Sequence, residues 1–103
     1  MSDSPRLTLA EIERRVVSFL KGKPAATRDQ WRELGPQGMR LLYTIAVTGG
    51  GDVARQRLRA AALATLGQLG GAQGMKPLVD ALTEPGISVM VRCGAIEGLG
   101  HAG

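Results

Sequence analysis

The feature of this sequence that most constrains its fold is a stretch that occurs twice. LRAAALATLGQLGG begins at Leu58, and VRCGAIEGLGHAG begins at Val91. The two copies align without a gap and lie 91 − 58 = 33 residues apart. Self-similarity at a fixed period of this length is typical of proteins built from stacked repeats. The sequence therefore predicts an array of similar structural units.

A second pair of segments recurs at nearly the same spacing. GPQGMRLLY begins at Gly35 and GAQGMKPLV begins at Gly71, which is 71 − 35 = 36 residues later. The glycine turn 49–51 accommodates the three extra residues. Both segments of a two-segment unit thus recur, and their apolar residues follow helical spacing. The pattern predicts an array of helical hairpins.

Start and stop signals divide the chain into six predicted helices. Thr8 and Glu11 form a T-x-x-E capping box, Thr27 and Gln30 form a T-x-x-Q box, and Asp52 is a suitable N-cap. No stretch alternates with period two for long enough to predict a strand, so we expect an all-α fold. The predicted helices run from Thr8 to the stop at Lys21-Gly22-Lys23-Pro24, and then over 27–34, 36–47, 53–69, 72–83 and 88–100.

Length and composition set outer limits on the fold and its location. A chain of 103 residues is one domain or part of one, and with 3% aromatic residues its core must be aliphatic. The net charge of +4 permits nucleic acid binding without arguing for it. The single cysteine, Cys93, favours a reducing compartment. No signal peptide and no apolar run of membrane-spanning length is visible, so we expect a cytoplasmic protein without membrane association.

The first helix of each predicted unit carries a recurring pattern of Arg, Ala, Leu and Gly. The matching positions are Leu58-Arg59…Ala62-Leu63…Leu66-Gly67…Leu69-Gly70 and Val91-Arg92…Ala95-Ile96…Leu99-Gly100. This pattern resembles the HEAT repeat, especially the bacterial HEAT-like type first grouped with phycobilin lyases, over about Gly35 to Gly103. The resemblance implies an α-solenoid of antiparallel helix hairpins, with about six helices in this chain. The acidic residue that the family places in the turn between the helices of a unit is matched by Glu84 alone.

The resemblance also implies a domain organisation. We expect a flexible tail over 1–7 and a single solenoid domain over 8–103. Within that domain, 8–34 form N-terminal capping helices, and 35–70 and 71–103 form the repeat region. The last unit stops after its first helix. Its apolar residues are therefore expected to lack a partner helix: Val91, Ala95 and Leu99. Either the natural protein continues past this end, which we favour, or another chain covers it.

Candidate binding residues follow from the same resemblance. Arg59 and Arg92 are expected to be structural, forming a polar ladder between units by bonding to turn carbonyls or acids. Second helices line the concave surface of such arrays, and aligning them places Arg40 on Lys76 and Thr44 on Asp80. The candidate partner-binding residues are Arg40, Tyr43, Thr44, Lys76 and Asp80. Trp31 is expected to close the N-terminal end of the stack, and Cys93 to be at least half-buried.

The sequence contains no pattern that indicates catalysis. No nucleophile–base set, paired carboxylates, CxxC or phosphate-binding loop is visible, and His101 has no second ligand beside it. We therefore expect no enzyme, cofactor or metal site; a lyase activity, which the family's name suggests, lacks any candidate catalytic residue.

The expected function is a non-enzymatic protein-interaction module, a scaffold or adaptor. It would bind a protein through its concave face or its open C-terminal end, and that end also offers a surface for self-association. The alternative is nucleic acid binding through scattered arginines: Arg14, Arg15, Arg55, Arg57, Arg59 and Arg92.

Overall fold

The computed structural model describes residues 8–22, 26–69 and 72–102. Within these residues the chain forms six helices and no strand, which confirms the all-α prediction. The helices are α1 (Leu9–Lys21), α2 (Arg28–Glu33), α3 (Gly35–Val47), α4 (Val53–Leu69), α5 (Ala72–Thr83) and α6 (Val89–Ala102). All bounds lie within two residues of those predicted. The predicted tail 1–7 and the Gly70-Gly71 stop lie outside the described residues.

Side-chain caps fix three of the helix starts. The Thr8 hydroxyl accepts from the Glu11 N–H at 3.1 Å, and the Glu11 carboxylate accepts from the Thr8 N–H at 3.2 Å. Thr27 and Gln30 make the same reciprocal bonds at the start of α2. The Asp52 carboxylate accepts from the N–H of Arg55 in the first turn of α4 at 2.9 Å. Both predicted capping boxes and the predicted Asp52 cap are confirmed.

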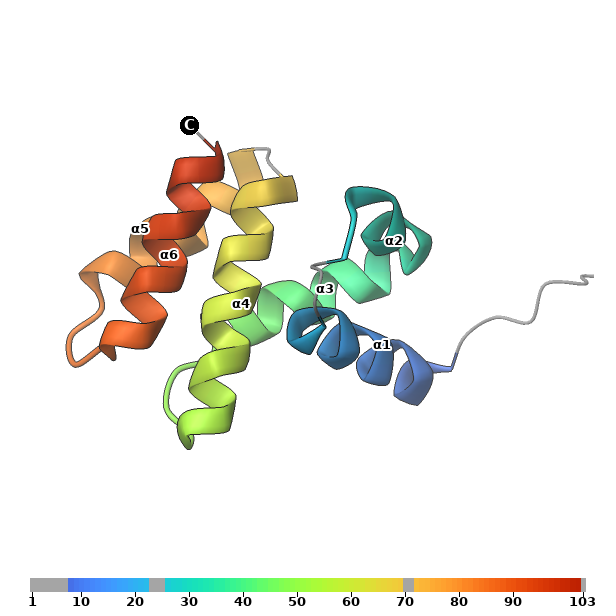
Figure 1. Ribbon diagram of the computed structural model, residues 1–103, viewed down its shortest axis with the longest axis horizontal. Coiled ribbons are helices and arrows are strands. Elements are labelled where there is room, and N and C mark those ends of the chain that lie inside the picture. Colours follow the sequence, from blue (N-terminus) through green and yellow to red (C-terminus); the bar gives the residue numbers. More distant parts are fainter. Residues whose placement is uncertain (1–7, 23–25, 70–71, 103) are drawn as a thin grey trace, which may run out of the picture.

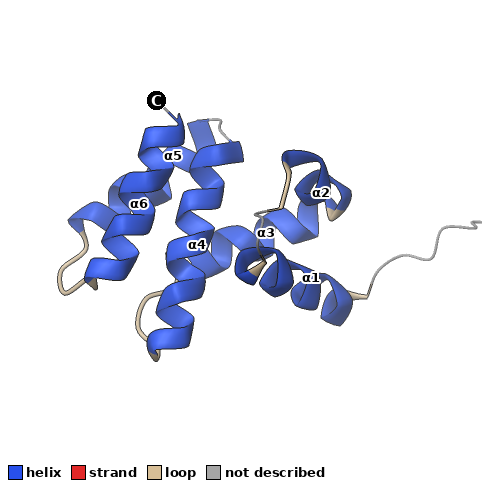
Figure 2. Ribbon diagram, viewed as in Figure 1, coloured by secondary structure: helices blue, strands red, loops and turns tan. Residues whose placement is uncertain are grey.

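The helices lie in two layers. In Figure 1, α1, α4 and α6 lie nearer the viewer, α3 and α5 lie behind them, and α2 packs at the N-terminal side of α3. The same view coloured by secondary structure shows that short loops join most of the helices (Figure 2). α4 and α6 run in the same direction, because α5 carries the chain back between them. This places the two copies of the repeated stretch side by side.

α4 and α6 make the most extensive helix–helix contact in the described part of the chain. Glycines allow their backbones to approach closely. A Cβ added at Gly94 would lie 2.7 Å from the Cα of Ala60, and one added at Gly67 would overlap the backbone of Gly98. Side chains normally keep packed helices further apart than this. Gly67, Gly94 and Gly98 are therefore packing residues.

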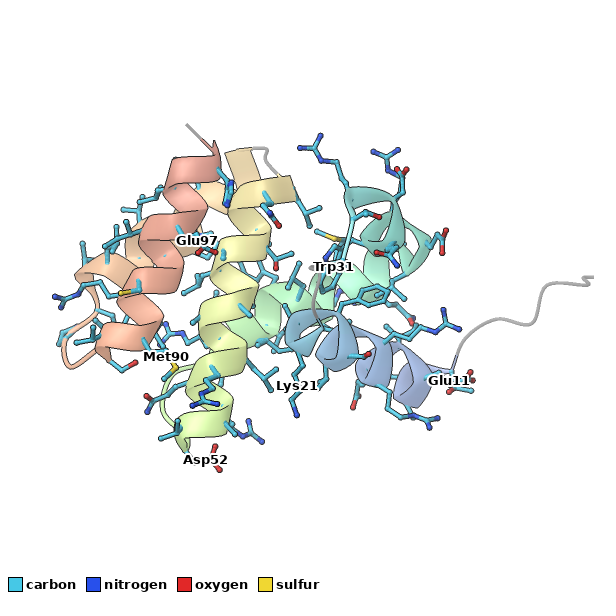
Figure 3. The ribbon with its side chains drawn as sticks, in the orientation of Figure 1. Glu11, Lys21, Trp31, Asp52, Met90 and Glu97 are labelled. Carbon is cyan, nitrogen blue, oxygen red and sulfur yellow. The ribbon has the colours of Figure 1, made fainter. Side chains whose placement is uncertain are left out.

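An aromatic contact helps to hold the N-terminal helices together. Trp31 is 2% exposed, and its ring meets that of Phe19 edge to face with centroids 5.1 Å apart. The Trp31 side chain lies where α1, α2 and α3 meet (Figure 3). Arg28 at the start of α2 donates to the Gln68 carbonyl near the end of α4 at 2.9 Å. Burial of Trp31 is consistent with closing this end and excludes an exposed stacking role.

The buried core is aliphatic apart from Trp31, as the composition predicts. Its largest fully buried side chains are Leu42, Leu63, Leu78, Val16 and Val91. The prediction that Val91, Ala95 and Leu99 lack a partner is wrong. Val91 and Ala95 are 1% and 0% exposed and belong to this core, and the half-buried Leu99 packs against it. The exposed face of α6 carries Val89 and Ile96 instead, with Cys93 between them. The prediction that Cys93 is half-buried or buried is therefore also wrong.

Candidate interaction surface

The five predicted partner-binding residues all lie on α3 and α5, and all are exposed. Arg40, Tyr43 and Thr44 are on α3, and Lys76 and Asp80 are on α5. Arg40 and Lys76, and Thr44 and Asp80, are pairs of aligned positions 36 residues apart, and each residue is exposed on its own helix. The two helices touch over a limited area within the rear layer. The predicted residues are thus distributed over two neighbouring helices.

Exposed apolar side chains accompany the polar ones. Tyr43 and Val47 on α3 are 39% and 45% exposed, and Met75 and Val79 on α5 are 38% and 47% exposed. Each pair is spaced i, i+4, so each forms one apolar stripe along its helix. We define the α3–α5 face as Arg40, Tyr43, Thr44, Val47, Met75, Lys76, Val79 and Asp80.

The apolar members of this face were largely missed in the sequence. Val79 lies in the apolar run Leu78-Val79-Asp80-Ala81-Leu82, in which the sequence does not show which residues face the core. The i, i+4 spacing of Met75 with Val79 was the available signal. It could not be separated from a core pattern without knowing which side of α5 packs inward.

The polar groups of the α3–α5 face are held loosely. The Lys76 ammonium lies 3.3 Å from the Asp80 carboxylate, and these side chains are 75% and 63% exposed. An ion pair this exposed contributes little to stability, so either charge can turn to a partner at small cost. The Thr44 hydroxyl already donates to the Arg40 carbonyl at 2.9 Å. Arg40, Tyr43, Lys76 and Asp80 are therefore the polar groups best placed to contact a second molecule.

Arg59 and Arg92 occupy aligned positions but different environments. Arg59 is 6% exposed; its Nε donates to the Ala46 carbonyl at 2.9 Å. Its two terminal nitrogens donate to the two carboxylate oxygens of Glu84 at 2.9 and 2.7 Å. Arg92 is exposed, and no partner for its guanidinium appears among the described residues. Arg59 thus joins the end of α3 to the turn after α5, whereas Arg92 is free to contact another molecule.

The bidentate pair with Arg59 also sets the ionisation of Glu84. Hydrogen bonds from the guanidinium lower the pKa of the Glu84 carboxyl, and the nearby positive charge acts in the same direction. Partial desolvation opposes this shift without cancelling it. The buried Arg59 cannot reach a phosphate, which removes it from the predicted nucleic-acid set. The other five arginines of that set are exposed and are spread over α1, α4 and α6.

A cleft between α1, α3 and α4 was not predicted. Its volume is about 360 Å³, and apolar side chains line most of it: Val16, Val17, Leu41, Ile45 and Leu58. Glu13 and Arg55 carry the charges in its lining, and the hydroxyls of Thr44 and Thr48 donate to carbonyls of their own helix. Lys21, labelled in Figure 3, ends α1 beside a second hollow against the start of α4. The contact between α1 and α4 is much less extensive than the contact between α6 and α4, which leaves room for this cleft.

Neither a cluster of metal-binding side chains nor a membrane-spanning helix is found among the described residues. In residues 8–22, 26–69 and 72–102, no three His, Cys, Asp or Glu side chains gather closely enough to hold a metal ion. Among the helices described, none combines the length and apolar character needed to cross a membrane.

Comparison of the chain with protein-family models, curated proteins and solved structures finds no match. The class that can be stated is an all-helical protein with two parallel, repeat-related helices packed backbone to backbone.

Proposed function

We propose that this chain is a HEAT-like α-solenoid module, without enzymatic activity, that binds a protein partner through the α3–α5 face. The observation that carries this proposal is the set of apolar side chains exposed on that face, from Tyr43 and Val47 to Met75 and Val79. Exposed apolar side chains that cluster beside polar ones are typical of protein-binding surfaces. The 33-residue period and the parallel α4–α6 pair support the solenoid architecture.

The chemistry of the face indicates what kind of partner segment it fits. Arg40 and Lys76 are cations at aligned positions of α3 and α5, beside the apolar stripes. A partner segment that presents an apolar side chain and a carboxylate would bury Val79 or Tyr43 and pair with one of these cations. Burying one such side chain contributes about 1–2 kcal/mol, and several are needed to offset the cost of association.

A display experiment tests this proposal directly. Random peptides would be selected on the immobilised chain, and their binding would be compared between the wild type and variants of the face. We expect acidic peptides with apolar residues to be enriched. Arg40→Glu with Lys76→Glu, or Val79→Asp, should weaken their binding about tenfold or more.

The matched control is Arg14→Glu with Arg15→Glu, which makes the same change of charge on exposed positions of α1. This control should bind the selected peptides as the wild type does, and circular dichroism should show unchanged helix content in every variant. Failure to enrich any peptide family, or equal binding by the face variants, would contradict the proposal.

A further inference from the structure

α6 carries an exposed apolar stripe that no other described helix covers. Val89 is 76% exposed and Ile96 is 55% exposed, Cys93 is exposed between them, and open space surrounds Gly100. Steps of 4, 3 and 4 residues place these four side chains within about 60° of each other around the helix. This spacing is that of the a and d positions of a heptad, with Cys93 and Gly100 at a and Val89 and Ile96 at d.

The repeat shows that the α6 stripe corresponds to a helix-docking surface. Moving back 33 residues, Cys93, Ile96 and Gly100 correspond to Ala60, Leu63 and Gly67 of α4. Those three residues are where α4 receives α6: the backbones of Ala60 and Leu63 lie against Gly94 and Gly98, and Gly67 lies against Gly98. The stripe is on the side of α6 away from Gly94 and Gly98. The exposed stripe of α6 therefore corresponds, position by position, to the surface through which α4 contacts α6.

Charges beside the stripe indicate which occupant fits it. Arg92 and Glu97 are exposed and lie about 140° apart on opposite flanks of the stripe, at the g and e positions of the same heptad pattern. Figure 3 shows Glu97 on the side of α6 nearer α4. In a parallel pair of identical helices, a g residue faces the e residue five positions later in the other helix. Two copies of α6 would then pair each Arg92 with the partner's Glu97, once on each side.

The opposite orientation is disfavoured by the same charges. In an antiparallel pair related by a two-fold axis, each flank faces the same flank of the other helix, so Arg92 would face the partner's Arg92. Like charges placed together in this way are destabilising. The stripe and its flanks are thus complementary to themselves in the parallel orientation alone.

We propose that two copies of this chain associate through parallel pairing of their α6 helices about a two-fold axis. Cys93 then lies beside the partner's Cys93 at an a position, next to the axis. The paired stripe is about three turns long, so the interface is small and we expect a Kd of ~10–100 µM. This surface is separate from the α3–α5 face, and neither proposal depends on the other.

Sedimentation equilibrium of the full chain over about 5–500 µM tests the association and its charge pattern. We expect a reversible dimer that Arg92→Glu weakens about tenfold and that Arg92→Glu with Glu97→Arg restores to near the wild-type Kd. Arg14→Glu, the same change on α1, should leave the Kd unchanged. A monomer at all concentrations, an open series of larger oligomers, or a dimer insensitive to Arg92→Glu would overturn the proposal. Arg40→Glu with Lys76→Glu should leave the Kd of the dimer unchanged. The dimer can therefore be tested independently of peptide binding by the α3–α5 face.

Disulfide cross-linking tests the orientation. Mild oxidation should join two copies through Cys93, because a positions next to a two-fold axis bring Cα atoms to a distance that a disulfide spans. In a Cys93→Ser background, Val89→Cys and Gly100→Cys should each cross-link to itself when the helices are parallel. Both positions are exposed, so these changes should preserve the fold. Cross-links that form only when the two variants are mixed would show an antiparallel pair and overturn the proposal.

Discussion

Arg59 is a buried residue whose side chain joins two other segments of the structure. Its guanidinium is almost fully buried and satisfies three acceptor atoms on two other segments. Arg59→Met keeps most of the apolar volume but leaves the Ala46 carbonyl without this donor. We expect the free energy of unfolding, measured by urea denaturation, to fall by about 2–3 kcal/mol. Arg57→Met, at an exposed position two residues earlier, should change it by less than about 0.5 kcal/mol. Equal effects of the two substitutions would contradict this role.

Glu84 should make stability depend on pH in the acid range. Its pKa is lowered in the folded state, so its contribution is fully present above the ordinary glutamate pKa of about 4.3 and is lost as pH falls through the folded value. Because about a third of the carboxyl side chain is exposed, water screens the pair, and we expect Glu84→Gln to cost about 0.5–1 kcal/mol at pH 7.

The pH series has a specific expected shape. Urea midpoints of the wild type and Glu84→Gln should differ by a constant amount from pH 7 to about pH 5 and converge as pH falls further below about 4.3. Glu13→Gln, on an exposed carboxyl of α1, is the control for general acid effects. A difference that persists unchanged at pH 3 would show that the Glu84 charge is not what stabilises the turn.

At the scale of elements, the close approach of α4 and α6 leads to a prediction that runs against helix propensity. Gly→Ala within a helix normally stabilises it by up to about 1 kcal/mol. At Gly94, however, the added Cβ would overlap the backbone of Ala60, and two backbones cannot yield as a flexible side chain would. We expect Gly94→Ala to lower the free energy of unfolding by about 1–3 kcal/mol.

Gly100 supplies the matched control for this prediction in the same helix. An added Cβ there meets nothing within 4 Å, so Gly100→Ala should raise the melting temperature or leave it unchanged. Thermal unfolding followed by circular dichroism measures both variants. A higher melting temperature for Gly94→Ala would contradict this prediction, because it would mean that α4 and α6 can move slightly apart without loss of stability.

At the scale of the whole molecule, local signals in the sequence were sufficient to predict the helices. The capping boxes at Thr8 and Thr27 and the Asp52 cap depend on contacts within one turn, so they can be recognised without knowing the fold. The recurrence of the Leu58 to Gly71 stretch from Val91 onward predicted that both stretches form equivalent helices. These signals explain why every predicted helix is present with nearly the predicted bounds.

The direction in which α6 faces could not be predicted in the same way. Ile96 aligns with Leu63, which is 0% exposed, yet Ile96 is 55% exposed. The two aligned positions differ in burial because the side of α4 that carries Leu63 packs against α6. The corresponding side of α6 has no neighbour among the described residues. The same non-local cause separates the buried Arg59 from the exposed Arg92. The cleft beside α1 likewise depends on how closely helices pack, which the repeat pattern does not encode.

The three-way contact of Arg59 has a consequence for how the chain unfolds. In arrays of helical hairpins, each unit contacts only its neighbours, and units can unravel one at a time from an end. A single guanidinium bonds to the end of α3 and to the turn after α5, so loss of either segment leaves this buried charge without some of its hydrogen-bond partners. The free-energy cost of disrupting the Arg59 contacts is therefore incurred when either segment opens. Opening the second segment as well adds little to that cost. The segment from α3 to the α5–α6 turn should therefore unfold as one cooperative unit, and α6 should unfold with it because α6 makes the most extensive contact with α4.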